Sequence, residues 1–280
     1  MFIWLASYPK SGNTLVRSLL SSYFFSKDGI FNFELIKNIK QFPIKELFLK
    51  NGIDINNEKE VIRSYLKIQE SINIKNSIQF LKTHSYLFNI ENNPFTKLEY
   101  SLGVIYIVRD PRNVVLSSSN HNNQSHERST EDLIIGRELK FKGKESIKVY
   151  TGTWGGGNFN SWKSFKSVNK YLLVHYEDLI KEKDKIFYEI LKFIHNLKNI
   201  EFVLDKKKFQ NVLDSTDFGK VQKLESQTGF HESMVYKNTG KKIKFFNLGE
   251  KTNWQSFLEP NLQNKIEEAF EKEMKELCYL

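Results

Sequence analysis

The first 25 residues constrain the fold more than any other stretch of the chain. Residues 2–6 form a short apolar run of strand length, and a compact polar turn follows at residues 10–14. Apolar residues then recur at helical spacing, at Leu15, Val16, Leu19, Leu20, Tyr23 and Phe24. A strand, a polar turn and a helix predict a phosphate-binding loop, because backbone N–H groups and the helix dipole converge on an anion at a helix N-terminus.

The side chains of this turn support the same prediction. Lys10 can lie along phosphate oxygens, and Ser11, Asn13 and Thr14 offer side-chain donors. The alternative is an ordinary strand-to-helix turn with a solvated lysine. The turn does not have the order of a nucleoside triphosphatase loop, which places its lysine after the last glycine. Here Lys10 precedes Gly12, and no second glycine opens the loop.

Composition limits the classes of protein to consider. A chain of 280 residues with 40% hydrophobic residues predicts one large domain, residues 1–280. It has no run of eighteen apolar residues, so we expect no transmembrane segment, and the first apolar run is too short for a signal peptide. Cys278 is the only cysteine, which indicates a fold without disulfides and a cytoplasmic location.

The net charge of +9 does not by itself identify a partner. It would suit an anionic small ligand, a nucleic acid, or an anionic glycan or lipid. The basic residues are almost all lysines, however, and their runs, at residues 206–208 and 241–242, are short. Nucleic-acid binders usually cluster arginine or interleave basic and aromatic residues, so we expect no nucleic-acid partner.

Strand-like and helix-like patterns alternate along the chain, which predicts an α/β fold. Strands are expected at 77–81, 102–108 and 171–175, and none has the pattern of a hairpin partner. Residues 27–76 have the pattern of a helical insertion, and 122–160 that of polar loops around a short helix near 131–140. Further helices are expected at 111–121, 160–168, 186–197, 206–214, 217–225 and after Pro260. The prediction is a central parallel sheet flanked by helices in three layers.

Two further strands end in functional groups. Lys82 and His84 stand at the end of one strand, on the same face because alternate residues share a face. Arg109 ends the most apolar strand, and Asp110 and Pro111 predict the cap and first residue of the following helix. Because ligands gather at the carboxyl ends of parallel strands, these groups and the loop at 10–14 predict one shared site. A structural histidine beside a solvated lysine is the alternative for residues 82–84.

Three of these segments resemble the sulfotransferases, which use 3′-phosphoadenosine 5′-phosphosulfate (PAPS) as sulfuryl donor. The sequence YPKSGNT at residues 8–14 resembles the family's 5′-phosphosulfate loop, and KTH at 82–84 has the matching place in chain order. Residues 106–117 resemble the segment that binds the 3′-phosphate, with Arg109 and Ser117 eight residues apart as in the family. The resemblance extends from Trp4 to Trp254.

The resemblance implies an activity and roles. The chain would be a single α/β domain, like the P-loop nucleotide kinases in fold, that moves a sulfuryl group to a hydroxyl or amine by in-line transfer. His84 would be the general base, and Lys10 and Lys82 would stabilise charge. Residues 10–14 would bind the 5′-phosphosulfate, and Arg109 and Ser117 the 3′-phosphate. No metal ion is required, and the product is adenosine 3′,5′-bisphosphate (PAP).

Other matches to the family are looser. Tyr176 and Phe218 would contact the adenine, and Gly249 stands in register with the glycine of a C-terminal RKGxxGxW element. Three positions depart from the pattern, namely Leu15 in place of a tryptophan and Asn247 and Leu248 in place of the arginine and lysine. The sequence leaves open whether Lys242, Lys244 or Lys251 replaces those basic groups. Arg112 is expected on the outer face of its helix, in a structural role.

Several alternatives stay open at this point. A P-loop-like kinase would use ATP, a basic binding protein would explain the charge, and a non-catalytic relative would bind nucleotide without transfer. The acceptor can be a glycan, a lipid, a phenol or a small metabolite, and the oligomeric state is open. Residues 27–76 and 122–160 are expected to build the acceptor site. Their aromatic residues would line it or belong to the core.

Overall fold

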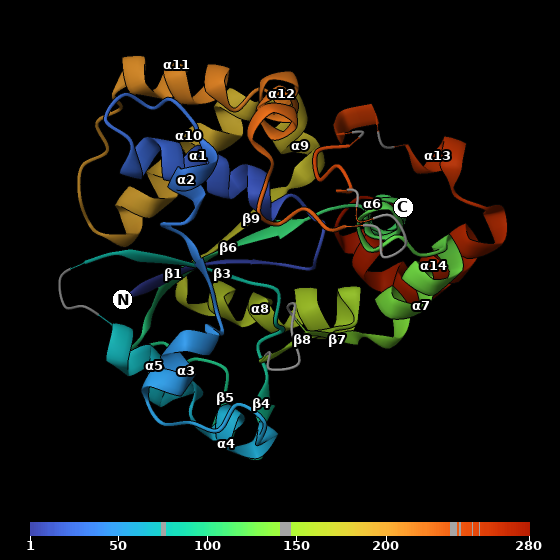
Figure 1. Ribbon diagram of the computed structural model, residues 1–280, viewed down its shortest axis with the longest axis horizontal. Coiled ribbons are helices and arrows are strands. Elements are labelled where there is room, and N and C mark those ends of the chain that lie inside the picture. Colours follow the sequence, from blue (N-terminus) through green and yellow to red (C-terminus); the bar gives the residue numbers. More distant parts are fainter. Residues whose placement is uncertain (74–76, 141–146, 236–239, 241, 248, 252) are drawn as a thin grey trace.

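A five-stranded parallel sheet stands at the centre of the computed structural model, which describes residues 1–280 except 74–76, 141–146, 236–239, 241, 248 and 252 (Figure 1). The strand order is β2-β3-β1-β6-β9. Their bounds are β1 Phe2–Ser7, β2 Lys40–Gln41, β3 Gln79–Thr83, β6 Ser101–Val108 and β9 Tyr171–His175. Each neighbouring pair is parallel, with Trp4 opposite both Leu81 and Val104. The predicted parallel sheet is therefore confirmed.

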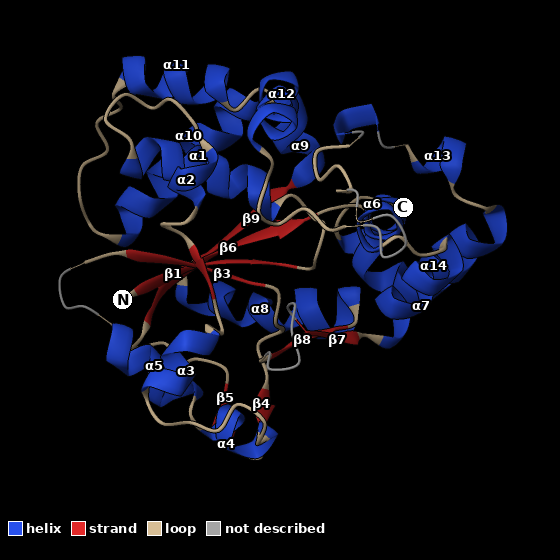
Figure 2. Cartoon of the chain, in the orientation of Figure 1, coloured by secondary structure: helices blue, strands red, loops and turns tan. Residues whose placement is uncertain are grey.

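Helices cover both faces of the sheet, as Figure 2 shows. Alternate residues of β1 point to opposite faces, so Ile3 and Leu5 join one core cluster while Phe2, Trp4 and Ala6 join another. The first cluster includes side chains of α1 (Asn13–Phe25), α10 (Lys183–Leu197) and α11 (Lys206–Ser215). The second includes side chains of α5 (Tyr65–Ile72), α8 (Asn160–Trp162) and α14 (Pro260–Glu276). The three predicted layers are present.

The segment 27–76 contains several short helices, as predicted, but it also supplies an edge strand. Its described helices are α2 Phe33–Ile36, α3 Lys45–Lys50, α4 Glu58–Arg63 and α5. Between α2 and α3, Lys40 and Gln41 pair in parallel with Leu81 and Lys82 of β3. A two-residue strand has no periodicity that a sequence pattern could reveal. Because β2 pairs with β3, the chain after α2 runs beside the end of β3 that carries Lys82.

The expectation of a sheet without hairpins was wrong for two small additions. β4 (Asn89–Ile90) pairs antiparallel with β5 (Asn93–Pro94), and β7 (Arg137–Lys140) pairs antiparallel with β8 (Lys148–Gly152). In β8, Val149 and Thr151 are buried while their neighbours are partly exposed, an alternation hidden in a polar, glycine-rich stretch. The part of the predicted loop at 141–146 lies outside the described residues.

The helix expected near 131–140 was placed too late in the chain. α7 spans His126–Ile135, because the Ser125 hydroxyl accepts a hydrogen bond from the N–H of Arg128 and caps the helix there. The π-helix η1 (Trp154–Phe159) then leads into α8 and the 3₁₀ helix η2 (Lys163–Val168). β9 was expected to be buried, but it lies at the sheet edge, and Val174 is its only fully buried side chain.

The other helices follow the predicted boundaries closely. α6 spans Pro111–Asn122, and the Asp110 carboxylate accepts a hydrogen bond from the N–H of Arg112, which confirms the predicted cap. α12 spans Phe218–Thr228, as predicted. The described helices for which there was no prediction are α9 Tyr176–Lys181, η3 Gly249–Lys251 and α13 Trp254–Phe257. No helix in the described ranges combines the length and apolar character that crossing a membrane would need.

Candidate active site

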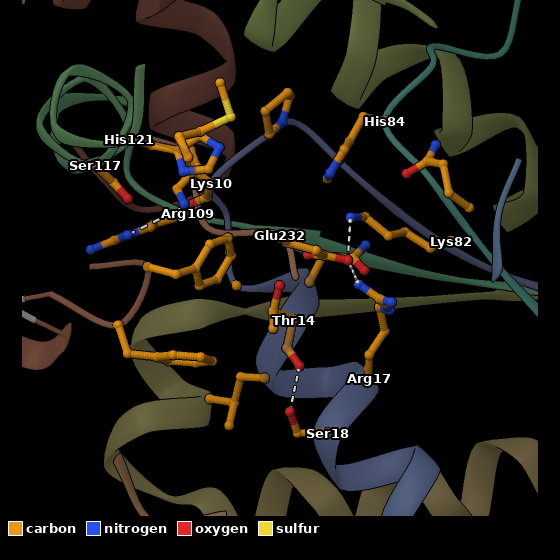
Figure 3. Close-up of a pocket in the computed structure, with 18 of the residues that line it drawn as sticks. Lys10, Thr14, Arg17, Ser18, Lys82, His84, Arg109, Ser117, His121 and Glu232 are labelled. Atoms are coloured by element: carbon orange, nitrogen blue, oxygen red, sulfur yellow. Dashed lines mark hydrogen bonds and ion pairs between the residues drawn. The ribbon is translucent and has the colours of Figure 1, made fainter. Parts of the chain in front are cut away.

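The predicted functional segments meet at one large cavity of about 1650 Å³ at the carboxyl ends of the central strands. Lys10, Lys82, His84 and Arg109 all line it (Figure 3). Lys10 follows β1, Lys82 and His84 stand at the end of β3, and Arg109 follows β6. A second wall comes from the chain after α12, with His231, Glu232, Met234, Phe245, Phe246, Asn247 and Gly249. A third comes from the chain beside β2, with Lys37, Ile39, Lys40, Gln41, Pro43, Ile44, Lys45, Glu46 and Leu47.

The loop between β1 and α1 forms an open cradle. Gly12 caps α1 with φ 99°, and a Cβ there would lie 2.3 Å from Cδ2 of Tyr176, so only glycine fits. The first bonds of the helix run from the N–H groups of Leu15 and Val16 to the Gly12 carbonyl, and no side chain caps the helix. The hydroxyl of Ser11 is buried and has no hydrogen-bond partner among the described residues. Unpaired donors at a helix N-terminus are what an anion binds.

Asn13 has a different use from the one predicted. Its side-chain amide donates to the carbonyl of Leu5 at 2.9 Å and to the hydroxyl of Ser7 at 3.2 Å. Both N–H donors are therefore directed at β1, and the side chain fixes the cradle to the strand. Thr14 lines the cavity one residue later. The prediction that the Asn13 side chain donates to a phosphate was wrong, because its amide nitrogen already donates to the Leu5 carbonyl and the Ser7 hydroxyl of β1.

Lys10 lies against the second wall. Its backbone has φ 67°, and its Nζ lies 3.9 Å from the centre of the Phe245 ring. Burial lowers the pKa of Lys10 to about 7, and the positive charges of Arg109 and Lys82 add to the fall while Glu232 opposes it. An anion in the cradle would favour the charged ammonium.

Arg109 and Ser117 lie on the same side of the cavity, as Figure 3 shows. Arg109 is buried, its Nη1 donates to the Lys10 carbonyl at 3.3 Å, and its guanidinium lies 4.4 Å from the centre of the Tyr176 ring. The Nε–H of Arg109 has no partner among the described residues. His121, one helical turn after Ser117, also lines this side. Arg109 and Ser117, which are eight residues apart in the sequence, thus line the same part of the cavity.

His84 is held in a single tautomer. Its Nδ1 lies 2.9 Å from the carbonyl oxygen of Ser7 and 3.2 Å from the Ser7 hydroxyl. Because a carbonyl oxygen only accepts, we assign the proton to Nδ1, which leaves Nε2 with its lone pair. Burial, together with the charge of Lys82, lowers the pKa of His84 to about 3. The imidazole is therefore neutral at physiological pH.

Glu232 is a charged residue of the site that sequence reasoning missed. Its Oε1 lies 2.6 Å from Nη1 of Arg17 and 3.6 Å from Nζ of Lys82. Burial would raise the pKa of Glu232, but Lys82 and Arg17 hold it well below its usual range. Arg17 and Glu232 are 215 positions apart in the sequence. No local pattern could have joined them.

Comparison with known proteins places the chain in a family. The family model of the sulfotransferase domain matches residues 2–278. The chain belongs to the sulfotransferase family. The sequence-based resemblance and the predicted enzyme class are thereby confirmed. Among curated proteins, none matches this sulfotransferase significantly.

Solved structures share the fold of this sulfotransferase at low sequence identity. A mouse sulfotransferase, SULT7A1, complexed with PAP is 19% identical, with a TM-score of 0.60, over 98% of this chain and 84% of that one. Retinol dehydratase in complex with retinol and PAP is 17% identical, with a TM-score of 0.62, over 98% of this chain and 81% of that one. Retinol dehydratase with androsterone and PAP is 16% identical, with a TM-score of 0.58, over 98% and 80% of the two chains.

The far end of the cavity holds the loosely matched residues of the sulfotransferase. Phe218 and Gly249 both line it, and a Cβ on Gly249, which has φ 57°, would lie 2.7 Å from the Phe218 ring. Tyr176 lines the cavity as well, beneath Gly12. Leu248 lies outside the described residues. The expected substitute cations Lys242, Lys244 and Lys251 are exposed and are not part of the described cavity lining, which on this side has His121 and Lys183 instead.

Arg112 is structural, but not where it was expected. Instead of lying on the outer face of α6, it is buried and bonded to Asp110 at 2.7 Å and Glu267 at 2.6 Å. Its guanidinium also lies 3.8 Å from the centre of the Trp254 ring. Arg112 therefore joins α6 to α14 and to the C-terminal element that contains Trp254.

The aromatic side chains considered for the acceptor site belong to the core or pack against it. Those at Phe31, Phe33, Phe42, Phe48, Phe88, Trp154 and Phe159 are buried, and Tyr86 is partly buried. None of them is part of the described cavity lining. Apolar residues that do line the cavity include Pro43, Ile44, Leu47, Ile147 and Phe257. Within the described residues, no three histidine, cysteine, aspartate or glutamate side chains are grouped closely enough to hold a metal ion.

Proposed function

We propose that this sulfotransferase takes its sulfuryl group from PAPS and transfers it in line to a hydroxyl or amine of an acceptor, with His84 as general base. The observation that carries the proposal is the meeting of Lys10, Lys82, His84 and Arg109 around one cavity at the strand ends. Two of the solved structures with this fold, SULT7A1 and retinol dehydratase, are complexes with PAP, the product expected from PAPS.

The proposed donor site runs from the cradle to Arg109. The 5′-phosphosulfate would accept hydrogen bonds at the N-terminus of α1, where the buried hydroxyl of Ser11 has no other partner among the described residues. The 3′-phosphate would accept from Arg109, whose buried Nε–H is likewise unpartnered there, and from Ser117. A buried hydrogen-bond donor without a partner lowers the stability of the fold unless a bound ligand accepts its hydrogen bond.

The adenine would lie at the far end of the cavity. Phe218 offers an aromatic face there, close to Gly249, and Tyr176 would contact the adenine from beside the cradle. Leu15 lines the cavity where the family commonly has a tryptophan, so an aliphatic side chain would replace a stacking ring. We expect this end to contribute less affinity than the phosphate contacts.

His84 is placed to move a proton. In the proposed step, Nε2 takes the acceptor proton while the acceptor atom bonds to sulfur, the bond from sulfur to the 5′-phosphate oxygen breaks, and PAP leaves. The pKa of about 3 for His84 reflects burial beside Lys82 in the ligand-free site. The negative charges of the donor would raise that pKa and so strengthen the base.

Lys10 and Lys82 would stabilise the charge that develops during transfer. Lys10 stands at the cradle and Lys82 beside His84, so that one ammonium can face the leaving phosphate and the other the sulfuryl oxygens. Cations fixed in a buried site stabilise a transition state more than mobile ones in water, because they need no reorganisation. Apolar side chains on the third wall would hold the body of the acceptor.

Calorimetric titration tests the donor. Wild type and Arg109→Ala would be titrated with PAP, adenosine 5′-monophosphate, and ATP with and without Mg²⁺. We expect a marked preference for PAP and a loss of about 10- to 100-fold in PAP affinity in the variant, the usual worth of a charged hydrogen bond. Equal or better binding of ATP would overturn the proposal in favour of a kinase. PAPS binding without transfer to water or any acceptor would indicate a non-catalytic relative.

A further inference from the structure

We propose that Glu232 is a positioning residue for sulfuryl transfer, whose carboxylate fixes the ammonium of Lys82 beside His84. The inference rests on the proposed function. Figure 3 shows the Glu232 carboxylate between Lys82 and Arg17, on the side of the cavity that also holds His84. The three charged groups come from three separate parts of the chain, namely α1, β3 and the segment after α12.

The contacts make Glu232 the link between two buried cations. Arg17 is only 3% exposed and Lys82 only 7%, and both approach the same carboxylate oxygen. Two unpaired cations buried side by side would repel each other, and each would lose its hydration. The carboxylate therefore holds both in place. Arg17 is further fixed by a bond from Nη2 to the Ile39 carbonyl at 3.3 Å.

Lys82 has few other groups that could orient its ammonium. The charged and titratable groups around it are Glu232 and His231 from the segment after α12, Arg17 from α1, Lys10 from the cradle and His84 from its own strand end. Glu232 is the acidic one among them. On β2, the register partner of Lys82 is the uncharged Gln41. An ammonium on a four-carbon stem needs such a partner to keep one direction.

The charge of Lys82 also depends on this carboxylate. Burial lowers the pKa of Lys82 to about 8, Glu232 opposes the fall, and Arg17 adds to it. Removal of the Glu232 charge would therefore lower the pKa further and leave more of Lys82 neutral near pH 8. A neutral lysine would stabilise the sulfuryl oxygens less.

Glu225 provides a matched control in the same region. Its buried carboxylate accepts from the hydroxyl of Ser233 at 2.7 Å and from the N–H groups of Phe245 and Phe246 at 2.8 and 3.0 Å. It thus holds the segment that carries Glu232, but has no ion pair with Lys82 or Arg17 among the described residues. Comparison of Glu225→Gln with Glu232→Gln therefore distinguishes a general loosening of this segment from a specific loss of the Glu232 charge.

The experiment uses water as acceptor, since water is always present. Single-turnover transfer from ³⁵S-labelled PAPS releases sulfate and PAP, and its rate is measured between pH 6 and 9.5. The proteins are wild type, Glu232→Gln, Glu232→Asp and Glu225→Gln. Lysine side chains labelled with ¹³C at Cε give the pKa of Lys82 directly by NMR, with Lys82→Arg for assignment.

We expect Glu232→Gln to slow transfer about 10- to 100-fold at pH 8, as misplaced catalytic groups do. The falling limb of its pH profile and the measured pKa of Lys82 should both move to lower pH. Its affinity for PAP should stay within about threefold of wild type, which also shows that the variant folds. Glu232→Asp should recover most of the rate. Glu225→Gln should leave the measured pKa of Lys82 unchanged, because the charge of Glu225 acts on Lys10 instead.

Three results would overturn the inference: an unchanged pKa of Lys82 in Glu232→Gln, a faster transfer in that variant, or the same shift in Glu225→Gln. A faster variant would mean that the carboxylate obstructs the site. The proposed function fails separately, if wild type binds no PAP. If Glu232→Gln does not fold, Glu232→Asp provides the test. A displaced pKa of Lys82 in that variant, together with a wild-type rate of transfer, would contradict a positioning role.

Discussion

The two main walls of the cavity are built in different ways. The strand-end wall, with Lys10, Lys82, His84 and Arg109, comes from short connections directly after strands of the buried sheet. The second wall, here called the C-terminal wall, consists of residues 230–234 with 245–247 and 249, and none of these residues belongs to a strand of that sheet. In Figure 1 it is the orange segment between α12 and α13 that crosses near the ends of β1 and β6.

The C-terminal wall is held by a few strong contacts instead of a sheet. Phe230 packs against Phe33 and Phe245, with ring centres 4.6 and 5.0 Å apart. The carboxylates of Glu225 and Glu232 supply the polar attachments. Groups for chemistry thus stand on the rigid frame, while the wall that closes the cavity depends on contacts that single substitutions can remove.

Substitution of His84 tests whether the proton transfer belongs to the strand-end wall alone. His84→Ala should slow sulfuryl transfer about 100- to 10,000-fold, the usual worth of a general base. PAP affinity should change little, because the cradle, Arg109 and Ser117 supply the proposed phosphate contacts. Single-turnover rates and calorimetry check the two statements.

The matched control is His231→Ala, which removes a histidine from the C-terminal wall. His231 lines the cavity but is nearly half exposed and has no bond to Ser7. Its loss should slow transfer by less than about tenfold, since a surface substitution usually costs little. Equal losses in the two variants would show that His84 has no special role.

Arg17→Met tests the polar attachment between the walls. The substitution keeps an unbranched apolar side chain but removes the closest cation from the partly buried carboxylate of Glu232, which keeps Lys82 at 3.6 Å and His231 at 3.9 Å. We expect the free energy of unfolding to fall by about 3 kcal/mol, as when one partner of a buried ion pair is removed. Urea denaturation measures it.

Arg128→Met is the surface counterpart. Arg128 is largely exposed and pairs with Glu131 and Asp132 within α7. Its removal should cost less than about 1 kcal/mol, because exposed ion pairs contribute little. A loss for Arg17→Met no greater than this would mean that the C-terminal wall is held by its aromatic contacts.

Gly12→Ala tests how closely the cradle is fitted to Tyr176. The added Cβ would meet the ring at 2.3 Å and would occupy a backbone with φ 99°. PAP affinity should fall about tenfold or more, since the cradle N–H groups must shift.

Gly52→Ala is the control, because at φ 73° with open space around it the substitution imposes similar backbone strain outside the cavity. It should lower stability by about 1 kcal/mol and leave PAP affinity unchanged. A normal affinity in Gly12→Ala would show that the ring can move aside.

The two walls also differ in how far the sequence reveals them. Strand-end residues follow apolar runs whose period and length are local, so the positions of Lys10, His84 and Arg109 could be predicted along with the parallel sheet. Arg109 and Ser117 are likewise joined by one strand-to-helix turn. The structure brings these residues to one cavity, and their roles stay a proposal.

What could not be predicted depends on partners far apart in the chain. Glu232 becomes significant only beside Arg17 and Lys82, and the burial of Arg112 only beside α14. The side-chain amide of Asn13 could donate a hydrogen bond to a phosphate, but it donates to the backbone carbonyl of Leu5 instead. β2 is too short to have a period, and β8 is hidden among polar residues. Tertiary contacts decide each of these, and no local pattern encodes them.

The smallest predicted effect concerns pH and joins the two walls at Lys10. Its pKa of about 7 reflects burial against the C-terminal wall, where Phe245 covers the ammonium. Bound 5′-phosphate favours the charged form, so binding takes up a proton once the free lysine has lost its own. PAP affinity should therefore fall as pH rises above 7, by at most about tenfold per pH unit for a single proton.

Calorimetry in buffers of different ionisation enthalpy measures that proton uptake between pH 7 and 9. Lys10→Arg is the control, because a guanidinium stays charged throughout this range and can keep the contact with Phe245. It should remove most of the pH dependence, and any remainder would belong to Lys82, whose pKa is about 8. The same slope in Lys10→Arg and wild type would mean that the phosphate is bound without Lys10, by the other donors of the cradle.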